Sequence, residues 1–326
     1  MRFELTAIAA VFASVLVASG AGAQSYTGYP TQPIRVMVVT AAGGGSDITM
    51  RVVADKASQG LKQSIIVENR PGASGAIGAE MVAKAAPDGY TLLCGTSTTV
   101  VMLPVVNPKL PYDPVRDYAA IGQMTRGNIL IVVRDTLPAA SVAEFVRHAK
   151  ANPGKLSYGT AGVGTTQHLA AELFSQEAGI DMIHVPYKGT ALAASDLMTG
   201  RIDLMFDNVA PAMTSIKQGK ARAIAVASAN RVAGLPDTPT TREAGYPQLE
   251  VQTWVGLFAP RGTPKPIVDR LSGELKRVMS LPEVVDKLVA AGNDLAYSTP
   301  EQFAAYTKAE IEKWRGVVNS RNLKFE

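Results

Sequence analysis

Two glycine-rich segments combine small, flexible residues with hydroxyl side chains, a pattern suited to binding an anion. They are residues 40–47 (TAAGGGSD) and residues 159–168 (GTAGVGTTQH). Glycines let a ligand approach the backbone closely. If a helix starts after each segment, its free N–H groups and the positive end of its dipole attract negative charge. Ser46, Thr165 and Thr166 would add hydroxyl donors.

The types of anion that these segments could bind are limited by what they lack. Neither contains Lys or Arg. The Gly-x-x-x-x-Gly-Lys-Ser/Thr pattern of nucleotide phosphate loops is absent, and the second segment lacks the third glycine of the dinucleotide fingerprint. A singly charged carboxylate needs only a few neutral donors. The alternative is that both segments are merely tight connections, but two in equivalent places favour a site.

Groups that could support catalysis are few and scattered. The histidines are His148, His168 and His184, and only His168, the last residue of the second segment, is placed to donate to a ligand. No Gly-x-Ser-x-Gly or His-Glu-x-x-His motif is present. The single cysteine, Cys94, is expected to be a small buried hydrophobe rather than a nucleophile. We therefore expect no catalytic residue, no metal site and no cofactor, and treat an enzyme as the less favoured alternative.

Strands and helices alternate along the chain, as in a parallel α/β sheet. Each glycine segment follows a strand and begins a helix, the first helix being capped by Ser46, so both segments should lie where ligands bind in open sheets. Capping boxes at Ser141 and Thr299 begin two further helices. The predicted strands are 34–39, 65–67, 90–94, 121–124, 129–133, 156–159, 183–185, 202–206, 223–227 and 253–258. The predicted helices are 47–59, 80–84, 141–150, 166–177, 192–198, one after Pro264 and one from Thr299.

This order of elements predicts two α/β lobes, of which the first is discontinuous. Lobe 1 would comprise residues 24–124 plus 229–326, and lobe 2 residues 125–228. The strands 121–124 and 223–227 would cross between them, which places a hinge and a cleft at the boundary. Two sequential domains with one linker are the alternative, but no Pro/Gly/Ser-rich linker interrupts the middle of the chain.

The N-terminus predicts a cleaved secretory signal peptide over residues 1–23. Arg2 precedes an apolar run from Ala7 to Ala18, and a small-residue site follows at residues 21–23 (AGA). The run is shorter than the ~20 residues that a spanning helix needs, although an uncleaved anchor is the alternative. We expect a soluble periplasmic protein that begins near Gln24.

Composition narrows the range of partners. The formal net charge is +4 and no dense Lys/Arg run is present, so we expect no nucleic-acid partner. The chain is 47% hydrophobic and 18% charged, which is typical of a folded protein with substantial cores.

Seven short motifs, in order and spread over nearly all of the predicted mature chain, carry a family resemblance. They are 43–47 (GGGSD), 67–75 (VENRPGASG), 87–92 (PDGYTL), 158–169 (YGTAGVGTTQHL), 185–189 (VPYKG), 235–245 (LPDTPTTREAG) and 254–260 (WVGLFAP). With these motifs the sequence resembles the Bug receptors, the extracytoplasmic solute receptors of tripartite tricarboxylate transporters.

The resemblance implies an α/β periplasmic-binding-protein fold of the Venus flytrap, type II-like kind, which closes on its ligand. It also implies a carboxylate held by the two glycine loops, partly through water, with strand-end residues contacting the rest. The residues carried over are Ala41, Gly44, Gly45, Asp47, Thr96, Ser97, Gly164, Thr165, Thr166, His168, Asp207 and Asn208. Family members often carry an aromatic residue and a proline where this chain has Thr40-Ala41-Ala42, so we expect a smaller or more polar pocket wall here.

The resemblance also implies function and partners. We expect a monomeric receptor that captures a small carboxylate, such as a di- or tricarboxylate or an aromatic acid, and delivers it to the membrane subunits of a tripartite tricarboxylate transporter. A receptor that feeds a membrane sensor kinase is the alternative.

Overall fold

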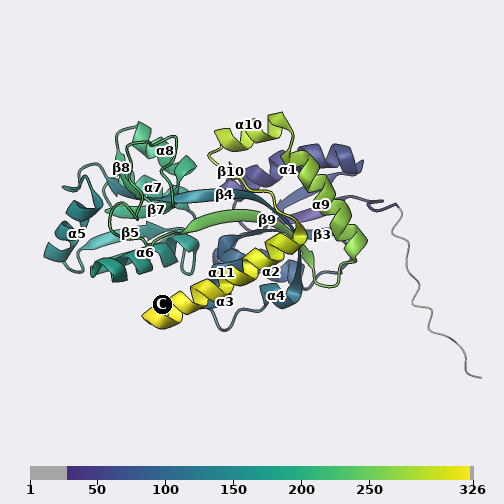
Figure 1. The fold of residues 1–326 in the computed structure, drawn as a ribbon, viewed down its shortest axis with the longest axis horizontal. Helices are drawn as coiled ribbons and strands as arrows, with labels where there is room; N and C mark the ends of the chain where they lie inside the picture. The colour runs from purple at the N-terminus through teal and green to yellow at the C-terminus, as the bar shows by residue number, and fades with distance from the viewer. Residues whose placement is uncertain (1–27, 324–326) are drawn as a thin grey trace, which may run out of the picture.

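A computed structural model describes residues 28–323, which form two α/β halves that share one strand (Figure 1). This strand, β4 (Tyr118–Arg134), is 17 residues long and pairs with strands of both halves. The strand order along the sheet is β2-β1-β3-β9-β4-β7-β5-β6, with β8 and β10 also paired to β4. The predicted signal peptide lies outside the described residues.

The first half is built on parallel strands whose two faces are both covered. These strands are β1 (Ile34–Val38), β2 (Ile65–Asn69) and β3 (Thr91–Thr96). Side chains alternate between the faces. Ile34, Val36 and Val38 pack with helices α1 (Gly45–Leu61) and α9 (Lys265–Met279), whereas Met37 packs with α2 (Ala76–Ala83). This double burial explains the nearly continuous apolar run of β1.

The second half repeats the arrangement. Its parallel strands are β5 (Leu156–Thr160), β6 (Met182–Pro186) and β7 (Leu204–Asn208). Leu204 and Phe206 pack in the cluster that contains α5 (Val142–Ala151) and α6 (Thr166–Ala178). Met205 packs instead with α7 (Thr190–Met198) and α8 (Val209–Lys217).

The remaining elements connect or cover these two halves. They are a 3-10 turn (Ala73–Gly75), a π-helical turn (Thr98–Met102), α3 (Leu103–Val106), α4 (Pro114–Asp117), β8 (Ala221–Val226), β9 (Gln252–Pro260), α10 (Pro282–Ala290), β10 (Asp294–Leu295) and α11 (Pro300–Arg321).

The strands that join the halves differ from those predicted. Residues 121–124 and 129–133 belong to the single strand β4 rather than to two strands. The predicted crossing strand 223–227 lies largely in β8, which pairs with Leu130–Arg134 of β4 and so stays within the second half. The strand that accompanies β4 into the first half is β9, antiparallel to residues 118–128. An apolar pattern predicts a strand but not its partner, which explains the error. The residue boundaries of the two lobes remain a prediction.

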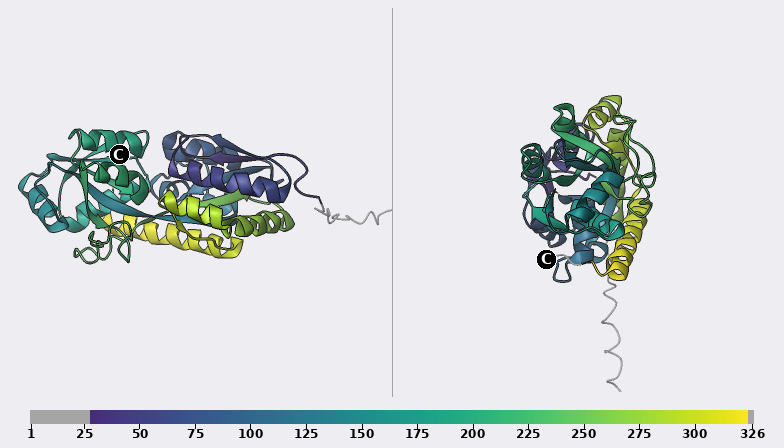
Figure 2. Two further views of the ribbon diagram at one scale, coloured as in Figure 1. Left: turned by 90° about the horizontal axis from the view of Figure 1, so that it is seen from above. Right: turned by 90° about the vertical axis from the view of Figure 1, so that its left-hand side faces the viewer.

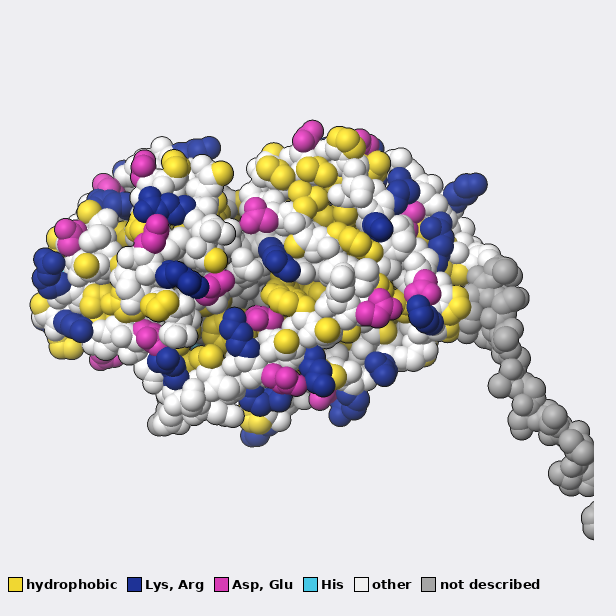
Figure 3. All heavy atoms as spheres, viewed as in Figure 1, with side chains coloured by type: hydrophobic (Ala, Val, Ile, Leu, Met, Phe, Trp, Pro, Cys, Tyr) yellow, Lys and Arg dark blue, Asp and Glu magenta, His cyan; other side chains and the backbone are white. Residues whose placement is uncertain are grey.

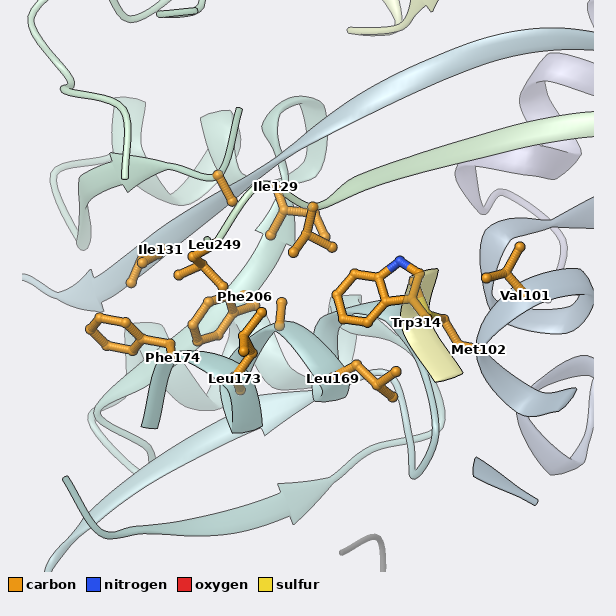
Figure 4. Close-up of a cluster of buried hydrophobic side chains, with 14 of the residues drawn as sticks. Val101, Met102, Ile129, Ile131, Leu169, Leu173, Phe174, Phe206, Leu249 and Trp314 are labelled. Atoms are coloured by element: carbon orange, nitrogen blue, oxygen red, sulfur yellow. The ribbon is translucent and has the colours of Figure 1, made fainter. Parts of the chain in front are cut away.

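Helix α11 contacts both halves and lies along them in Figure 2. The capping box predicted at Thr299 is present. At the other end of the helix, Arg321 forms an ion pair with Glu177 of α6. Between these ends Trp314, only 2% exposed, belongs to the cluster that extends through both halves. Figure 4 shows its ring next to Met102 and above Leu169.

Candidate functional site

The carboxyl ends of the parallel strands in the two halves face each other. After β3, Ser97 Oγ lies 2.9 Å and Thr98 Oγ1 lies 3.2 Å from Thr166 Oγ1 at the start of α6. Ser74 Oγ donates to the Val163 carbonyl oxygen at 2.8 Å. Figure 3 shows the surface hollowed between the halves on the side of α8 and α10. The second glycine loop therefore lies at the boundary between the halves, and the first follows β1, whose carboxyl end lies at the same edge of the sheet as that of β3.

The first glycine loop leaves the start of α1 without a side-chain cap. The N-cap is Gly44, in an extended conformation, so the first-turn N–H groups of Gly45, Ser46 and Asp47 receive no side-chain acceptor. The prediction that Ser46 is the cap was wrong, because the helix already begins at Gly45 and the Ser46 hydroxyl lies 2.7 Å from Thr40 Oγ1. A Cβ added at Gly45 would have no atom within 4 Å. An anion can therefore approach this helix start.

The Asp47 side chain holds the first loop in shape. Oδ2 accepts from the Gly43 N–H at 2.8 Å, and Oδ1 accepts from Arg51 Nε and from Asn69 Nδ2, both at 2.9 Å. Burial alone would raise the pKa of Asp47, but the Arg51, Gly43 and Asn69 hydrogen bonds lower it below its ordinary value. The carboxylate is thus balanced by protein groups, and a direct contact with a ligand stays a prediction.

The second glycine loop uses its donors within the protein. Thr165 caps α6 by accepting from the His168 N–H at 3.3 Å. The Thr166 N–H donates to Thr98 Oγ1 at 3.3 Å, and the Gly164 N–H donates to His168 Nδ1 at 3.1 Å. Because Thr98 belongs to the first half, the start of α6 is completed only when the halves meet.

His168 supports this second loop from inside. Its ring is 3% exposed and stacks on His184 with 3.9 Å between centroids. Burial, and then the neighbouring His184, lower the pKa of His168 to about 3. The ring is therefore neutral near pH 7. Since Nδ1 accepts a hydrogen bond, the proton of the neutral ring belongs on Nε2, which lies 3.7 Å from Glu172 Oε1. The predicted donation from His168 to a ligand stays untested.

Asp207, at the end of β7, is completely buried. Oδ1 accepts from the Asn208 N–H at 2.8 Å, whereas Oδ2 has no hydrogen-bond partner among residues 28–323. Burial raises the pKa of Asp207 to about 7, and the Asn208 N–H and the Thr190 hydroxyl act in the opposite direction. The adjacent Asn208 Oδ1 accepts from Thr253 Oγ1 of β9 at 2.8 Å, so this strand end also contacts the connection between the halves.

The predicted site residues thus fall into three groups at the boundary. The start of α1 contains Ala41, Gly44, Gly45 and Asp47; the interlobe contact contains Thr96, Ser97, Gly164, Thr165, Thr166 and His168; the end of β7 contains Asp207 and Asn208. The prediction missed Thr98, although the hydroxyl-rich run 96–99 (TSTT) marks it. It also gave no role to Arg51 and Asn69, which neutralise and hold Asp47.

Three further features of the described residues concern metal binding, membrane spanning and a further surface hollow. No group of three or more His, Cys, Asp or Glu residues in it is arranged to hold a metal ion. No helix within residues 28–323 has the length and hydropathy to cross a membrane. A separate surface hollow of about 470 Å³ lies between the α3–α4 connection and α11, lined by Leu110, Arg116 and Arg315 among others, and contains none of the predicted residues.

Two α/β halves joined by β4 and β9, with helix starts and strand ends facing each other, define a two-lobed binding protein of the Venus flytrap type. The model of the tripartite tricarboxylate transporter family receptor matches residues 49–323. The chain belongs to this receptor family, as its motifs suggested.

Relatives support the assignment over the whole chain. A UPF0065 protein from the tcbD-tcbE intergenic region of Pseudomonas sp. strain P51 is 37% identical, over 95% of this chain and 93% of its own. The Bordetella pertussis protein BugT is 31% identical, over 99% and 100%.

Solved structures share both sequence and fold. A structure described as a periplasmic transporter is 40% identical, with a TM-score of 0.86, over 91% of this chain and 99% of its own. An R. palustris protein described with adipate is 33% identical, with a TM-score of 0.85, and the match covers 91% of this chain and 99% of its own. MatC from Rhodopseudomonas palustris, described with bound malate, is 33% identical, with a TM-score of 0.83, over 89% and 100%.

Proposed function

We propose that this protein is a periplasmic receptor that captures a small carboxylate between its lobes and delivers it to the membrane subunits of a tripartite tricarboxylate transporter. The observation that carries the proposal is the uncapped start of α1, where the N–H groups of Gly45, Ser46 and Asp47 have no side-chain acceptor. The family membership supports the transport role, and the adipate and malate of two similar structures support the class of ligand.

The electrostatics of this helix start suit a carboxylate. The dipole of a helix end stabilises an anion by roughly 0.3–1 kcal/mol, and by more where water is excluded. Hydrogen bonds to a charged acceptor contribute ~1.5–3 kcal/mol each. Because Arg51 already balances Asp47, the acidic side chain in the first turn does not cancel this attraction. A few such bonds suffice for a micromolar dissociation constant.

Binding is proposed to close the two lobes about β4 and β9. The Ser97–Thr166 and Ser74–Val163 contacts join the halves, so they would form as the lobes approach. A monomer is sufficient for this mechanism. The two histidine rings near the second loop, buried His168 and partly exposed His184, stack on each other, and His184 Nε2 lies 2.7 Å from Thr160 Oγ1.

The decisive experiment compares a bound acid with its ester. Ligand retained by natively purified protein is identified by mass spectrometry, and calorimetry is then run with the acid and its methyl ester. We expect the ester to bind at least a hundredfold more weakly, because it loses the charge that the α1 start recognises. Equal binding of acid and ester would refute the proposed site. Uptake assays in a strain lacking the receptor test delivery separately.

A further inference from the structure

Asp207 has hydrogen-bonding capacity that the protein itself does not use. Its carboxyl group is completely buried, and Oδ2 has no hydrogen bond of normal geometry within residues 28–323, although the Thr190 hydroxyl is close enough to lower the pKa of the group. Buried polar atoms without partners are rare in native structures. Such an atom at the end of a strand that faces the cleft marks a place where a group from outside the chain completes the bonding.

Two helix starts next to Asp207 offer further donors. Met205 of β7 packs with α7 and α8, and strand alternation places Asp207 on the same face of the sheet. The N-caps of these two nine-residue helices, Gly189 and Asn208, provide no side-chain cap. The N–H groups of both helix starts therefore favour an acceptor, and an anionic one above all.

The protonation state of Asp207 is set by burial rather than by neighbouring charges. Burial raises its pKa to about 7, opposed by the Asn208 N–H and the Thr190 hydroxyl, and no charged side chain of residues 28–323 contributes to the shift. The titratable or charged groups on the elements packed against β7 are Tyr118, Arg126 and Arg134 of β4, Tyr158 of β5, His168, Glu172 and Glu177 of α6, Asp196 of α7, and Lys217 of α8. A protonated Asp207 presents a donor at the end of the strand, alongside the N–H donors of the helix starts.

We propose that protonated Asp207 donates a hydrogen bond to the second carboxylate of a dicarboxylate whose first carboxylate lies at the start of α1, so that binding takes up one proton. The proposal rests on the proposed function and assigns its ligand class. A doubly ionised acid and an ionised Asp207 combine with one proton, which ends on Asp207 Oδ2 and is shared with the ligand carboxylate. No other bond is made or broken.

The dependence of affinity on pH follows from this proton. Below about pH 7 Asp207 is already protonated, and the affinity for a dicarboxylate is at its maximum. Above that value the ionised Asp207 repels the second carboxylate until a proton is taken up. The dissociation constant should then rise towards tenfold per pH unit. A ligand whose far end is an amide accepts from protonated Asp207 and donates to ionised Asp207, so its affinity should change little.

The experiment uses the full mature chain and linear dicarboxylates of four to eight carbons, adipate included. Calorimetry of the tightest binder at pH 6.0–8.5, in buffers of different ionisation enthalpy, measures both affinity and protons taken up. We expect uptake near one proton above pH 7 for the diacid and near zero for its monoamide. Absence of dicarboxylate binding at pH 6, or binding without uptake at pH 8, would overturn the proposal. Ester-sensitive binding of a monocarboxylate would leave the proposed function intact in either case.

Two variants test whether Asp207 is the group that takes up the proton when the ligand binds. Asp207→Asn keeps the shape and places an N–H donor at every pH, so it should retain the pH 6 affinity within about threefold and lose the pH slope. Glu172→Gln is the matched control, because Glu172 also has a raised pKa caused mainly by burial but is bonded to Tyr158. The Glu172→Gln variant should keep the wild-type dependence of the dissociation constant on pH. A folded Asp207→Asn protein with the wild-type slope would refute the assignment, and the wild-type proton count tests the proposal even if that variant does not fold.

Discussion

The two glycine-rich loops have similar sequences, but the helices that follow them begin in different ways. At α1 the N-cap is Gly44, and no side chain accepts from the first-turn N–H groups. At α6 the N-cap Thr165 accepts from the His168 N–H, and Thr98 accepts from the Thr166 N–H. The start of α1 thus remains open to a ligand, whereas the protein itself completes the start of α6.

This difference shows that a glycine loop before a helix does not by itself define an anion site. A hydroxyl residue at the N-cap satisfies the helix start internally, and a glycine leaves it for a ligand. The residue that completes the start of α6 is Thr98 of the opposite half, so this hydrogen bond of the second loop forms only when the lobes are closed. We infer that the first loop recognises the ligand and the second joins the lobes.

The largest effect should come from adding bulk at the start of α1. In Gly45→Val the new Cβ meets no atom within 4 Å and the backbone needs no left-handed conformation, so the fold should persist. The isopropyl group would keep the carboxylate from its N–H donors. Losing two hydrogen bonds of ~1.5–3 kcal/mol each corresponds to at least a hundredfold loss of affinity, measurable by calorimetry.

Gly273→Val in α9 is the matched control, because its added Cβ also meets open space and the helix does not contribute to the predicted site. It should bind normally. Gly164→Val is a poorer test, because Gly164 has φ +74° and its Cβ would lie 3.0 Å from Leu103 and Val106. Normal binding by folded Gly45→Val would reverse the roles that we assign to the two loops.

An intermediate effect is expected at the contact between the lobes. Thr166 is completely buried, and Thr166→Val keeps its shape but removes the hydroxyl that meets Ser97 and Thr98. Leaving those groups unpaired costs ~1–3 kcal/mol in the closed state. We expect about a tenfold loss of affinity, mainly as faster dissociation in stopped-flow measurements.

A double-mutant cycle with Ser97→Ala tests this role. If the two hydroxyls act through one contact, the double variant should lose less affinity than the sum of the single losses. Additive losses, or a slower association rate with unchanged dissociation, would place Thr166 in direct ligand recognition instead.

The contrast between the loops also shows which features of the structure could be predicted from the sequence. Apolar runs such as residues 34–39 predicted the strands, and each glycine loop was placed correctly between a strand and a helix. The completion of the α6 start could not be predicted, because the acceptor for the Thr166 N–H is 68 residues away in the chain. Local sequence patterns predict where strands and helices lie, whereas the hydrogen-bond partners of the free N–H groups at a helix start depend on tertiary contacts.

The role of Asp47 illustrates the same limit. An acidic residue in the first turn of α1 was interpreted as a ligand contact, but its partner Arg51 lies one helical turn further on and Asn69 lies on β2. An i,i+4 pair of this kind is visible in sequence, whereas only the fold brings Asn69 to Asp47. The buried, partly unsatisfied state of Asp207 had no sequence signal at all.

The smallest effect on affinity, and the clearest pH signature, should come from His168→Asn. Asparagine can keep an acceptor near the position of Nδ1, so the Gly164 N–H remains bonded and affinity at pH 7 should change by less than about threefold, a difference of ~0.65 kcal/mol. The wild-type ring has a pKa lowered from 6.5 to about 3 by burial and by His184. Its folded pKa lies below the unfolded value, so the stability it contributes is complete above pH 6.5 and is lost as pH falls towards 3. The loss is up to ~1.4 kcal/mol per pH unit. Urea unfolding at pH 7, 6 and 5 should therefore show a shallower acid-dependent decrease for the variant. A large loss of affinity at pH 7, with unchanged stability and slope, would show that His168 contacts the ligand and that both loops recognise it.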